Sequence, residues 1–406
     1  MIAVLILFCV ISTFCVLLWH LAEKKAGHIN KSVYHYLPSV QIPLVNRQRI
    51  PDYSKLCGMD APRVIHNFNL AEACARPYRP FRWPYHQTMS LKKMNPDYWL
   101  EIESNYVERM AERQKLYEKL GKHVVSMLPG AHFAGLELLQ MVCQYYSIKY
   151  PTIFHLDNDT GEFYNTLTGK HYNVFIEADP MRCLNEISPN DFGVMLLMLD
   201  GKYHLRAGSI CSSLGWTLQT KIAKDLDGIH EPIPDYKEKM AFSMNRFFHA
   251  ITPDKSIERG SWGFEVGEPF NLPPEECSVE RGKIHTIDSL DPKEITLRVD
   301  WQTLRRLPRS GAVVFSFLCI FTPLEKLRDE PMVPEIALKV LKEGKANMME
   351  YKGTDCVKQI CEPLLEQWAK EQREMGLVPK EWEVATIDEA PFFPGWKRKH
   401  NSGCGE

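Results

Sequence analysis

The sequence predicts an α+β protein, in which helices accompany an antiparallel sheet. A hairpin is the first sign: Phe192–Leu199 is a nearly continuous apolar run, Asp200-Gly201 is a hairpin dipeptide, and apolar residues alternate beyond it. The second sign is the segment 295–301, where apolar and polar side chains alternate. The third is 312–321, another apolar run of strand length. Segments with helical spacing surround these strands.

Composition is that of a folded protein with no strong charge. The chain has 406 residues, of which 45% are hydrophobic and 25% charged, so disorder over most of its length is excluded. Its 49 basic and 51 acidic residues leave a net charge of -2, and without a global positive field no nucleic-acid partner is expected. Twelve cysteines contain no CxxC pair, which favours reduced thiols over a zinc site or a disulfide scaffold.

The N-terminus predicts a membrane anchor. No residue from Met1 to Leu21 is charged, and Ile2–Trp19 would form about 27 Å of apolar helix, close to the thickness of a hydrocarbon core. A cleaved signal peptide is the alternative, although it normally has a basic start and a shorter apolar run. Lys24 and Lys25 follow the apolar run and favour the cytosolic side for the remaining chain.

Helices are expected on both sides of the first hairpin. Residues 26–92 are rich in proline, arginine and aromatic residues, which predicts an extended segment at 23–92. Apolar residues recur at helical spacing between Pro96 and Leu120, with Gly121 as a stop. A second helix is predicted for about Gly135–Tyr146, and Ser188-Pro189 resembles a cap followed by a first-turn proline.

The second half alternates between helices and strands. Two helices, Thr217–Leu226 and Tyr236–Ala250, are predicted to flank a rigid loop at 227–234. Two late helices near 335–341 and 356–374 precede a polar tail.

In the segment 295–301 the alternation predicts that Leu297 and Val299 are buried and that Arg298 lies on the opposite face.

Chemical motifs are few. The sequence has no P-loop, Rossmann glycine fingerprint, HExxH or GxSxG motif, so common hydrolase and nucleotide-dependent classes are disfavoured. His230 lies in the expected loop, and the prolines on its C-terminal side would hold its imidazole in one direction, as suits a metal or haem ligand. A hydrogen-bonded structural histidine is the alternative.

Two further groups are candidates. His249 lies among aromatic residues on an expected helix, although a histidine at the surface would give the same pattern. The arginines of 298–308 could hold propionates or another carboxylate, since guanidinium pairs with planar anions. A solvated face explains that segment equally well.

Several ordered blocks of this sequence, spread over residues 76–325, resemble the haem-dependent oxidative N-demethylase alpha-subunit family, and in particular its fungal, membrane-anchored type. The blocks are YRPFRW at 78–83, HQTMSL at 86–91, LDGKYHL at 199–205, Trp216, Lys221, IHEPIP at 229–234, and the segment from Arg298 to Pro308.

This resemblance implies a PAS-like fold, an antiparallel sheet with helices enclosing a haem pocket, preceded here by one transmembrane helix. The implied organisation is an anchor at 1–22, an extended segment at 23–92, a PAS-like haem domain at 93–345, and a C-terminal helix with a polar tail at 346–406.

The resemblance also assigns roles to residues. His230 becomes the first choice for the axial ligand of the haem iron, and His249 the second. Trp216 and Lys221 are expected to contact the haem. Arg298 and Gln302 are expected to act in catalysis or to line the pocket.

The implied function is that of a haem-dependent monooxygenase, an oxidative N-demethylase-like enzyme. It would use dioxygen and electrons from a separate reductase to N-demethylate or hydroxylate an amine or an intermediate of secondary metabolism. A haem-binding sensor or carrier without turnover is the alternative, and a scaffold that has lost haem is a third. The anchor would place the catalytic domain on the cytosolic side of the endoplasmic reticulum membrane.

Departures from the family pattern predict a more apolar pocket. Phe317–Phe321 replaces a polar, arginine-containing stretch, and Ser261 stands where asparagine is frequent. A Cys-Ser-Ser run at 211–213 replaces a Pro-Ser pair ahead of the tryptophan. A substrate larger than dimethylamine would suit such a pocket.

Overall fold

The computed structural model describes residues 49–277 and 290–400. The chain divides into two units, and the second, Pro43–Glu406, contains every described residue. The transmembrane helix predicted for residues 1–22 lies outside the described residues. Within residues 49–277 and 290–400, no helix is both long and apolar enough to cross a membrane.

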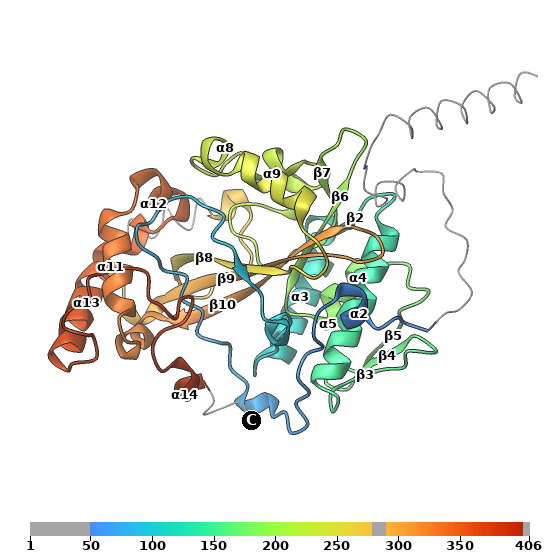
Figure 1. Cartoon of the computed structure of the whole chain (residues 1–406), viewed down its shortest axis with the longest axis horizontal. Helices are drawn as coiled ribbons and strands as arrows, with labels where there is room; N and C mark the ends of the chain where they lie inside the picture. The colour runs from blue at the N-terminus through green and yellow to red at the C-terminus, as the bar shows by residue number, and fades with distance from the viewer. Residues whose placement is uncertain (1–48, 278–289, 401–406) are drawn as a thin grey trace, which may run out of the picture. The chain divides into compact units, whose positions relative to one another are not determined.

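A seven-stranded antiparallel sheet forms the centre of this unit, in the order β1-β8-β9-β10-β6-β7-β2 (Figure 1). Its strands are β1 (Lys92–Lys93), β2 (Val125–Met127), β6 (Asp191–Leu197), β7 (Tyr203–Ser209), β8 (Ile257–Val266), β9 (Ile295–Arg306) and β10 (Val313–Pro323). A smaller antiparallel sheet has the order β3 (Phe154–Leu156), β4 (Glu162–Asn165) and β5 (Lys170–Asn173). Helices accompany both sheets, so the α+β prediction is confirmed.

The helices fall into three groups along the chain. Those before the first hairpin are α2 (Tyr53–Cys57), η2 (Leu70–Glu72), η3 (Pro96–Tyr98), α3 (Tyr106–Leu120), η4 (Gly121–His123), α4 (His132–Lys149) and α5 (Pro180–Ile187). Those between β7 and β8 are α6 (Leu218–Lys221), α7 (Leu226–His230), α8 (Tyr236–Lys239) and α9 (Ala241–Ala250). The later ones are η5 (Pro292–Glu294), η6 (Leu324–Asp329), α11 (Val333–Glu343), α12 (Ala346–Lys352), α13 (Asp355–Glu374) and α14 (Trp396–His400).

The hairpin predicted around Asp200-Gly201 connects β6 and β7. Gly201 has φ of 78°, a conformation that glycine adopts without steric cost, which explains its place in the turn. The register shifts between Val194 and Met195, which pair with Ala207 and Leu205, so Arg206 is the extra residue of a bulge in β7. Strand β6 also pairs with β10, and this pairing joins the β6–β7 hairpin to strands β8, β9 and β10.

Strand β9 separates two apolar clusters. Leu297 and Val299 are buried, as predicted, among side chains of α11 and α13. Leu304 lies on the opposite face, with side chains of α8 and α9. Arg298 is also on that opposite face and is only 4% exposed, because a cavity and covering helices lie there instead of solvent.

The helix predicted from Pro96 begins later than expected. Asn95 caps only one 3-10 turn, and α3 itself starts at Tyr106. The backbone between them is diverted because the N–H of Ser104 donates to the carbonyl of Ala73, a partner outside any helix. The predicted stop at Gly121 is confirmed.

Ser188-Pro189 does not start a helix, so that prediction is wrong. Ser188 instead follows the last residue of α5, and its hydroxyl is within hydrogen-bond distance, 2.9 Å, of the Tyr146 hydroxyl. The same signal occurs at Asp179-Pro180, where the Asp179 side chain accepts from the N–H of Arg182 and begins α5.

The loop predicted at 227–234 is partly helical. Asp225 accepts from the N–H of Gly228 and caps α7, and His230 is the last residue of that helix. The prolines at 232 and 234 therefore follow the end of a helix, which corrects the first half of the predicted rigid loop.

Candidate functional site

A cavity of about 620 Å³ lies between one face of the large sheet and the helices α6–α9. Its volume is within the range of about 300–1,000 Å³ that small-molecule and cofactor sites occupy. Residues of the extended N-terminal segment and of α12 complete the wall. Of the six residues singled out in the sequence, five line this cavity: Trp216, Lys221, His230, Arg298 and Gln302.

The floor of the cavity is a set of side chains in register across three strands. Gln302 of β9 is paired with Arg259 of β8 on one side and with Phe317 of β10 on the other. Two residues along, Asp300 is paired with Ser261. Because these positions alternate with core residues, the pleat of the sheet directs them all to one face.

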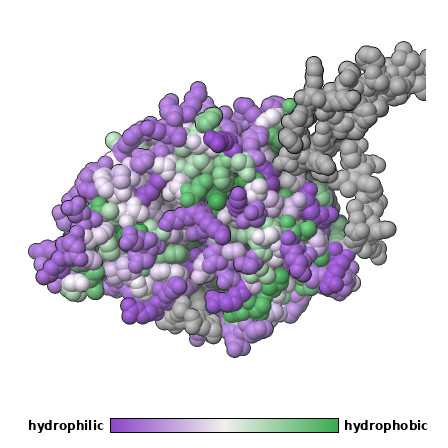
Figure 2. All heavy atoms as spheres, in the orientation of Figure 1, coloured by the Kyte–Doolittle hydropathy of each residue, from purple (hydrophilic) through white to green (hydrophobic). Residues whose placement is uncertain are grey.

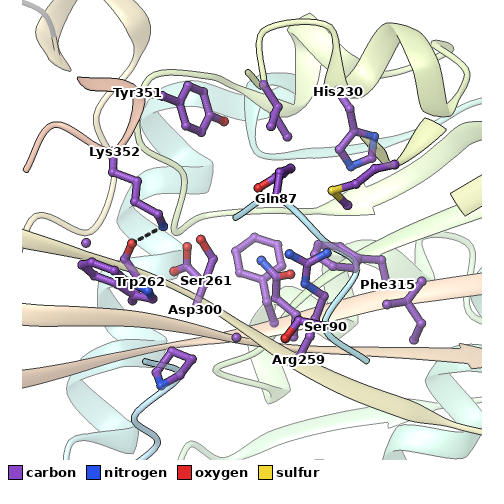
Figure 3. A pocket seen from close by; sticks show the side chains of 18 of the residues that line it. Gln87, Ser90, His230, Arg259, Ser261, Trp262, Asp300, Phe315, Tyr351 and Lys352 are labelled. Atoms are coloured by element: carbon purple, nitrogen blue, oxygen red, sulfur yellow. Dashed lines mark hydrogen bonds between the residues drawn. The ribbon is translucent and has the colours of Figure 1, made fainter. Parts of the chain in front are cut away.

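His230 has the geometry of a ligand. Its Nδ1 lies 2.7 Å from the carbonyl oxygen of Leu226, and because a carbonyl can only accept, Nδ1 carries the proton. Burial lowers the pKa of His230 to about 4, so the ring is neutral at physiological pH and Nε2 has a free lone pair. No described residue hydrogen-bonds to Nε2, and the ring is directed into the cavity (Figure 3).

Stacking and helix geometry fix the ring further. Tyr236 stacks on His230 with ring centroids 4.9 Å apart and an angle of 15° between the planes. The Nζ of Lys221 donates to the carbonyl of Ile229, 2.6 Å away, and burial lowers the pKa of this lysine. Lys221 thus connects α6 to the end of α7, one residue before His230. Trp216 is half-buried in the same wall.

Apolar side chains cover the cavity beside His230. Met240, Met244 and Phe248 come from α8–α9 and the junction between them, while Phe315 and Phe317 come from β10. Of the apolar stretch 317–321 noted in the sequence, only Phe317 lines the cavity, while Leu318 and Ile320 belong to the core on the other face. On the face shown in Figure 2, hydrophobic residues also gather next to the segment that carries α8 and α9.

His249, the second choice for the axial ligand, is not among the residues that line the cavity. It is exposed on α9, where its ring meets the edge of Tyr203 at 5.2 Å. Its neighbour Phe248 faces the cavity instead, since adjacent residues on a helix point in different directions.

Arg298 is held by the protein itself. Its guanidinium donates to the Asp300 carboxylate at 3.0–3.1 Å and to the carbonyls of Ser212 and Pro269 at 2.5 and 2.8 Å. It therefore orients Asp300 and the wall around Ser212, with little capacity left to bind a ligand directly.

Among the charged residues of the cavity that were not singled out in the sequence are Asp300, Arg259 and Lys352. Burial lowers the pKa of Arg259 to about 10, and no described residue accepts a hydrogen bond from its Nε. Burial also lowers the pKa of Lys352 to about 8, and its Nζ donates to the carbonyl of Trp262 at 2.5 Å (Figure 3).

A sequence signal existed for two of these residues. Between 257 and 266, Trp262 and Phe264 alternate with small and polar residues, as in a strand with one apolar face. Arg259 lies on the other face, and Asp300 lies between Arg298 and Gln302 in the same alternation. Lys352 follows β9 by some fifty residues, and only the tertiary fold brings it to the cavity.

These features fit haem better than a bare metal ion. Within the described ranges, no group of three or more His, Cys, Asp or Glu residues could hold a metal ion. Haem brings its own ring nitrogens and needs only an axial side chain, an apolar slot and cations for its propionates. His230, the apolar cover and Arg259 provide these three features.

Comparison with known proteins decides the family. A family model described as "Haem-dependent oxidative N-demethylase, alpha subunit-like" matches residues 90–361, more than half of the chain. The chain belongs to this family. The match to this haem-dependent oxidative N-demethylase alpha-subunit-like family begins just before β1 and ends within α13. It therefore includes all helices and strands that form the cavity. Membership supports a haem-dependent oxidoreductase in general.

Proposed function

We propose that the cavity binds haem with His230 as the axial ligand, and that the loaded protein oxidises an amine with dioxygen. The observation that carries this proposal is the state of His230: Nδ1–H is donated to the Leu226 carbonyl and Nε2 is left as a lone pair in the cavity. A backbone acceptor on Nδ1 is the usual arrangement behind a histidine that binds metal through Nε2.

A PAS-like fold is part of the proposal. The strands β6, β7, β8, β9 and β10 can be numbered one to five in chain order. Read across the sheet from β7 to β8, their order is then two, one, five, four, three. The four helices α6–α9 occur in the connection between the second and the third of these strands. This order, with a cavity between those helices and the sheet, supports the PAS-like architecture that family membership implies.

Bound haem would supply the electron transfer and oxygen chemistry, and the protein would supply position and polarity. Asp300 provides a carboxylate at the floor, fixed by Arg298, that could bind a protonated amine. Gln302, the register neighbour of Phe317, offers an amide beside the apolar part of the floor. Met240, Met244 and Phe248 exclude water from the side of His230.

We also propose the type of substrate and the setting. Phe315 and Phe317 make one part of the floor apolar, which favours a methylated amine or a metabolite intermediate larger than dimethylamine. Electrons would come from a separate reductase. An N-terminal anchor would hold the protein on the endoplasmic reticulum with this domain in the cytosol.

Turnover of the haem-loaded protein tests this function. The full chain would be loaded with haemin, reduced in air by a generic ferredoxin and reductase pair, and offered a panel of N-methylated amines. Mass spectrometry should detect formaldehyde and the demethylated amine with wild type and much less with Asp300→Asn. Haem binding without product from any amine would instead support a sensor or carrier.

A further inference from the structure

Two arginines in the cavity have no acidic partner. Arg259 and Arg82 both line it, and no described carboxylate lies within ion-pairing distance of either guanidinium. Arg82 donates to the hydroxyl of Thr88 at 2.7 Å and to the carbonyl of His86 at 2.6 Å, both neutral acceptors. Burial, and then the charge of Arg82, lower the pKa of Arg259, so the two cations repel each other across the cavity.

Two other arginines, both less than 5% exposed, have acidic partners, whereas the buried Arg305 stacks on Trp99 instead. Arg79 makes a two-pronged ion pair with Glu330, with contacts of 2.6 and 2.7 Å. Arg113 pairs with Asp191 at 2.6 Å. A buried cation without such a partner is costly, and it persists only where something else compensates.

The surroundings of Arg259 suit a bound anion. Gln87 and Ser90 line the same cavity and offer further polar atoms, as does His230 (Figure 3). The carboxylate Asp300 is held by Arg298, so it does not neutralise Arg259. A planar guanidinium is the side chain best suited to bind a carboxylate through two parallel hydrogen bonds.

We infer that Arg259, assisted by Arg82, is a carboxylate-binding site of this cavity. The carboxylate belongs either to a haem propionate or to the substrate, which would then be an N-methylated amino acid rather than a simple amine. This inference rests on the proposed function, because it concerns the same cavity. An anion would compensate the charges of Arg259 and Arg82 whether or not haem is the ligand.

Three ligands distinguish the sources: haemin, haemin dimethyl ester, whose propionates carry no charge, and N,N-dimethylglycine. Haem binding is followed by the Soret band of the full chain prepared without haem. Dimethylglycine binding is followed by calorimetry, with and without haem. If a propionate occupies the site, wild type binds haemin about tenfold more tightly than the ester, and Arg259→Gln removes that preference.

If the substrate occupies the site, Arg259→Gln leaves both haem affinities unchanged and abolishes binding of dimethylglycine. Binding of dimethylglycine without haem would support the site even if the haem proposal failed. The control is Arg305→Gln. Arg305 is buried, its guanidinium carbon lies 3.9 Å from the centre of the Trp99 ring, and it does not line the cavity. This substitution should change none of these affinities.

Folding of the variant gives a separate readout. Because Arg259 is a partly buried cation without an acidic partner, Arg259→Gln should leave the haem-free protein folded, with a melting temperature no lower than that of wild type. The inference is overturned if Arg259→Gln is folded and binds haemin, the ester and dimethylglycine as wild type does.

Discussion

Asp191 and Arg113 form a completely buried ion pair, with 2.6 Å between Oδ1 and Nη1. The same carboxylate accepts from the N–H groups of Cys211 and Ser212 at 2.8 and 2.7 Å, and from the Ser212 hydroxyl at 2.6 Å. Ser212 lines the cavity. One carboxylate at the start of β6 therefore connects α3 to the wall of the candidate site.

Asp191→Asn should destabilise the fold strongly. It removes the negative charge that compensates Arg113, and breaking a buried pair costs about 3–5 kcal/mol because the remaining charge stays buried. Urea unfolding followed by circular dichroism measures the loss. Glu371→Gln, which breaks a surface pair with Arg328, is the control and should cost far less, because solvent screens that pair. Equal effects of the two variants would contradict this role of Asp191.

Leu297→Ala tests the assignment of the two faces of β9. Leu297 is fully buried in the cluster shared with α11 and α13, so its truncation should cost about 2–5 kcal/mol. Leu199→Ala, at a leucine that is 86% exposed in the hairpin turn, should change the stability by less than about 0.5 kcal/mol. A loss well under 1 kcal/mol at Leu297 would mean that its face is not the core.

Glu103 should make the stability depend on pH. Burial raises its pKa from 4.5 to about 7. Below pH 4.5 the carboxyl is protonated in both states and costs nothing. Between pH 4.5 and about 7 the unfolded chain is ionised while the folded chain keeps its proton, so stability is lost across this window, by about 3 kcal/mol in total.

Glu103→Gln removes this titration. It should therefore match wild type at pH 4 and exceed its free energy of unfolding by about 3 kcal/mol at pH 8. Denaturant unfolding at the two pH values measures the difference. Glu381→Gln, at an exposed glutamate, controls for the loss of one negative charge. A constant difference between Glu103→Gln and wild type at both pH values would refute the buried carboxyl.

Local sequence patterns predicted the strands well. The hairpin around Asp200-Gly201 and the alternation in β9 depend on nearest neighbours and on a period of two, which the sequence displays directly. The start of α3 could not be predicted, because it is set by a hydrogen bond from Ser104 to Ala73, in a segment some thirty residues away. The prediction that Ser188-Pro189 starts a helix failed because a capping residue followed by proline occurs at both ends of α5.

The candidate site was predictable only in part. His230 and Gln302 were singled out by the family resemblance, and the fold brings both to one cavity. Arg259 faces this cavity because β8 pairs with β9 in a register that places it opposite Gln302, and register is a property of the sheet, not of either strand. His249 was indistinguishable from a ligand in the sequence, but the rotation of α9 exposes it.

The central claim is that His230 binds the haem iron, and the visible spectrum of the haemin-loaded protein tests it most directly. Wild type, His230→Ala and His249→Ala would be compared in the ferric, ferrous and carbon monoxide-bound states, with and without added imidazole. The account predicts that His230→Ala alone loses haem or changes the Soret band, and that imidazole restores the wild-type spectrum. An unchanged spectrum in His230→Ala, or the loss of it in His249→Ala instead, would contradict the account.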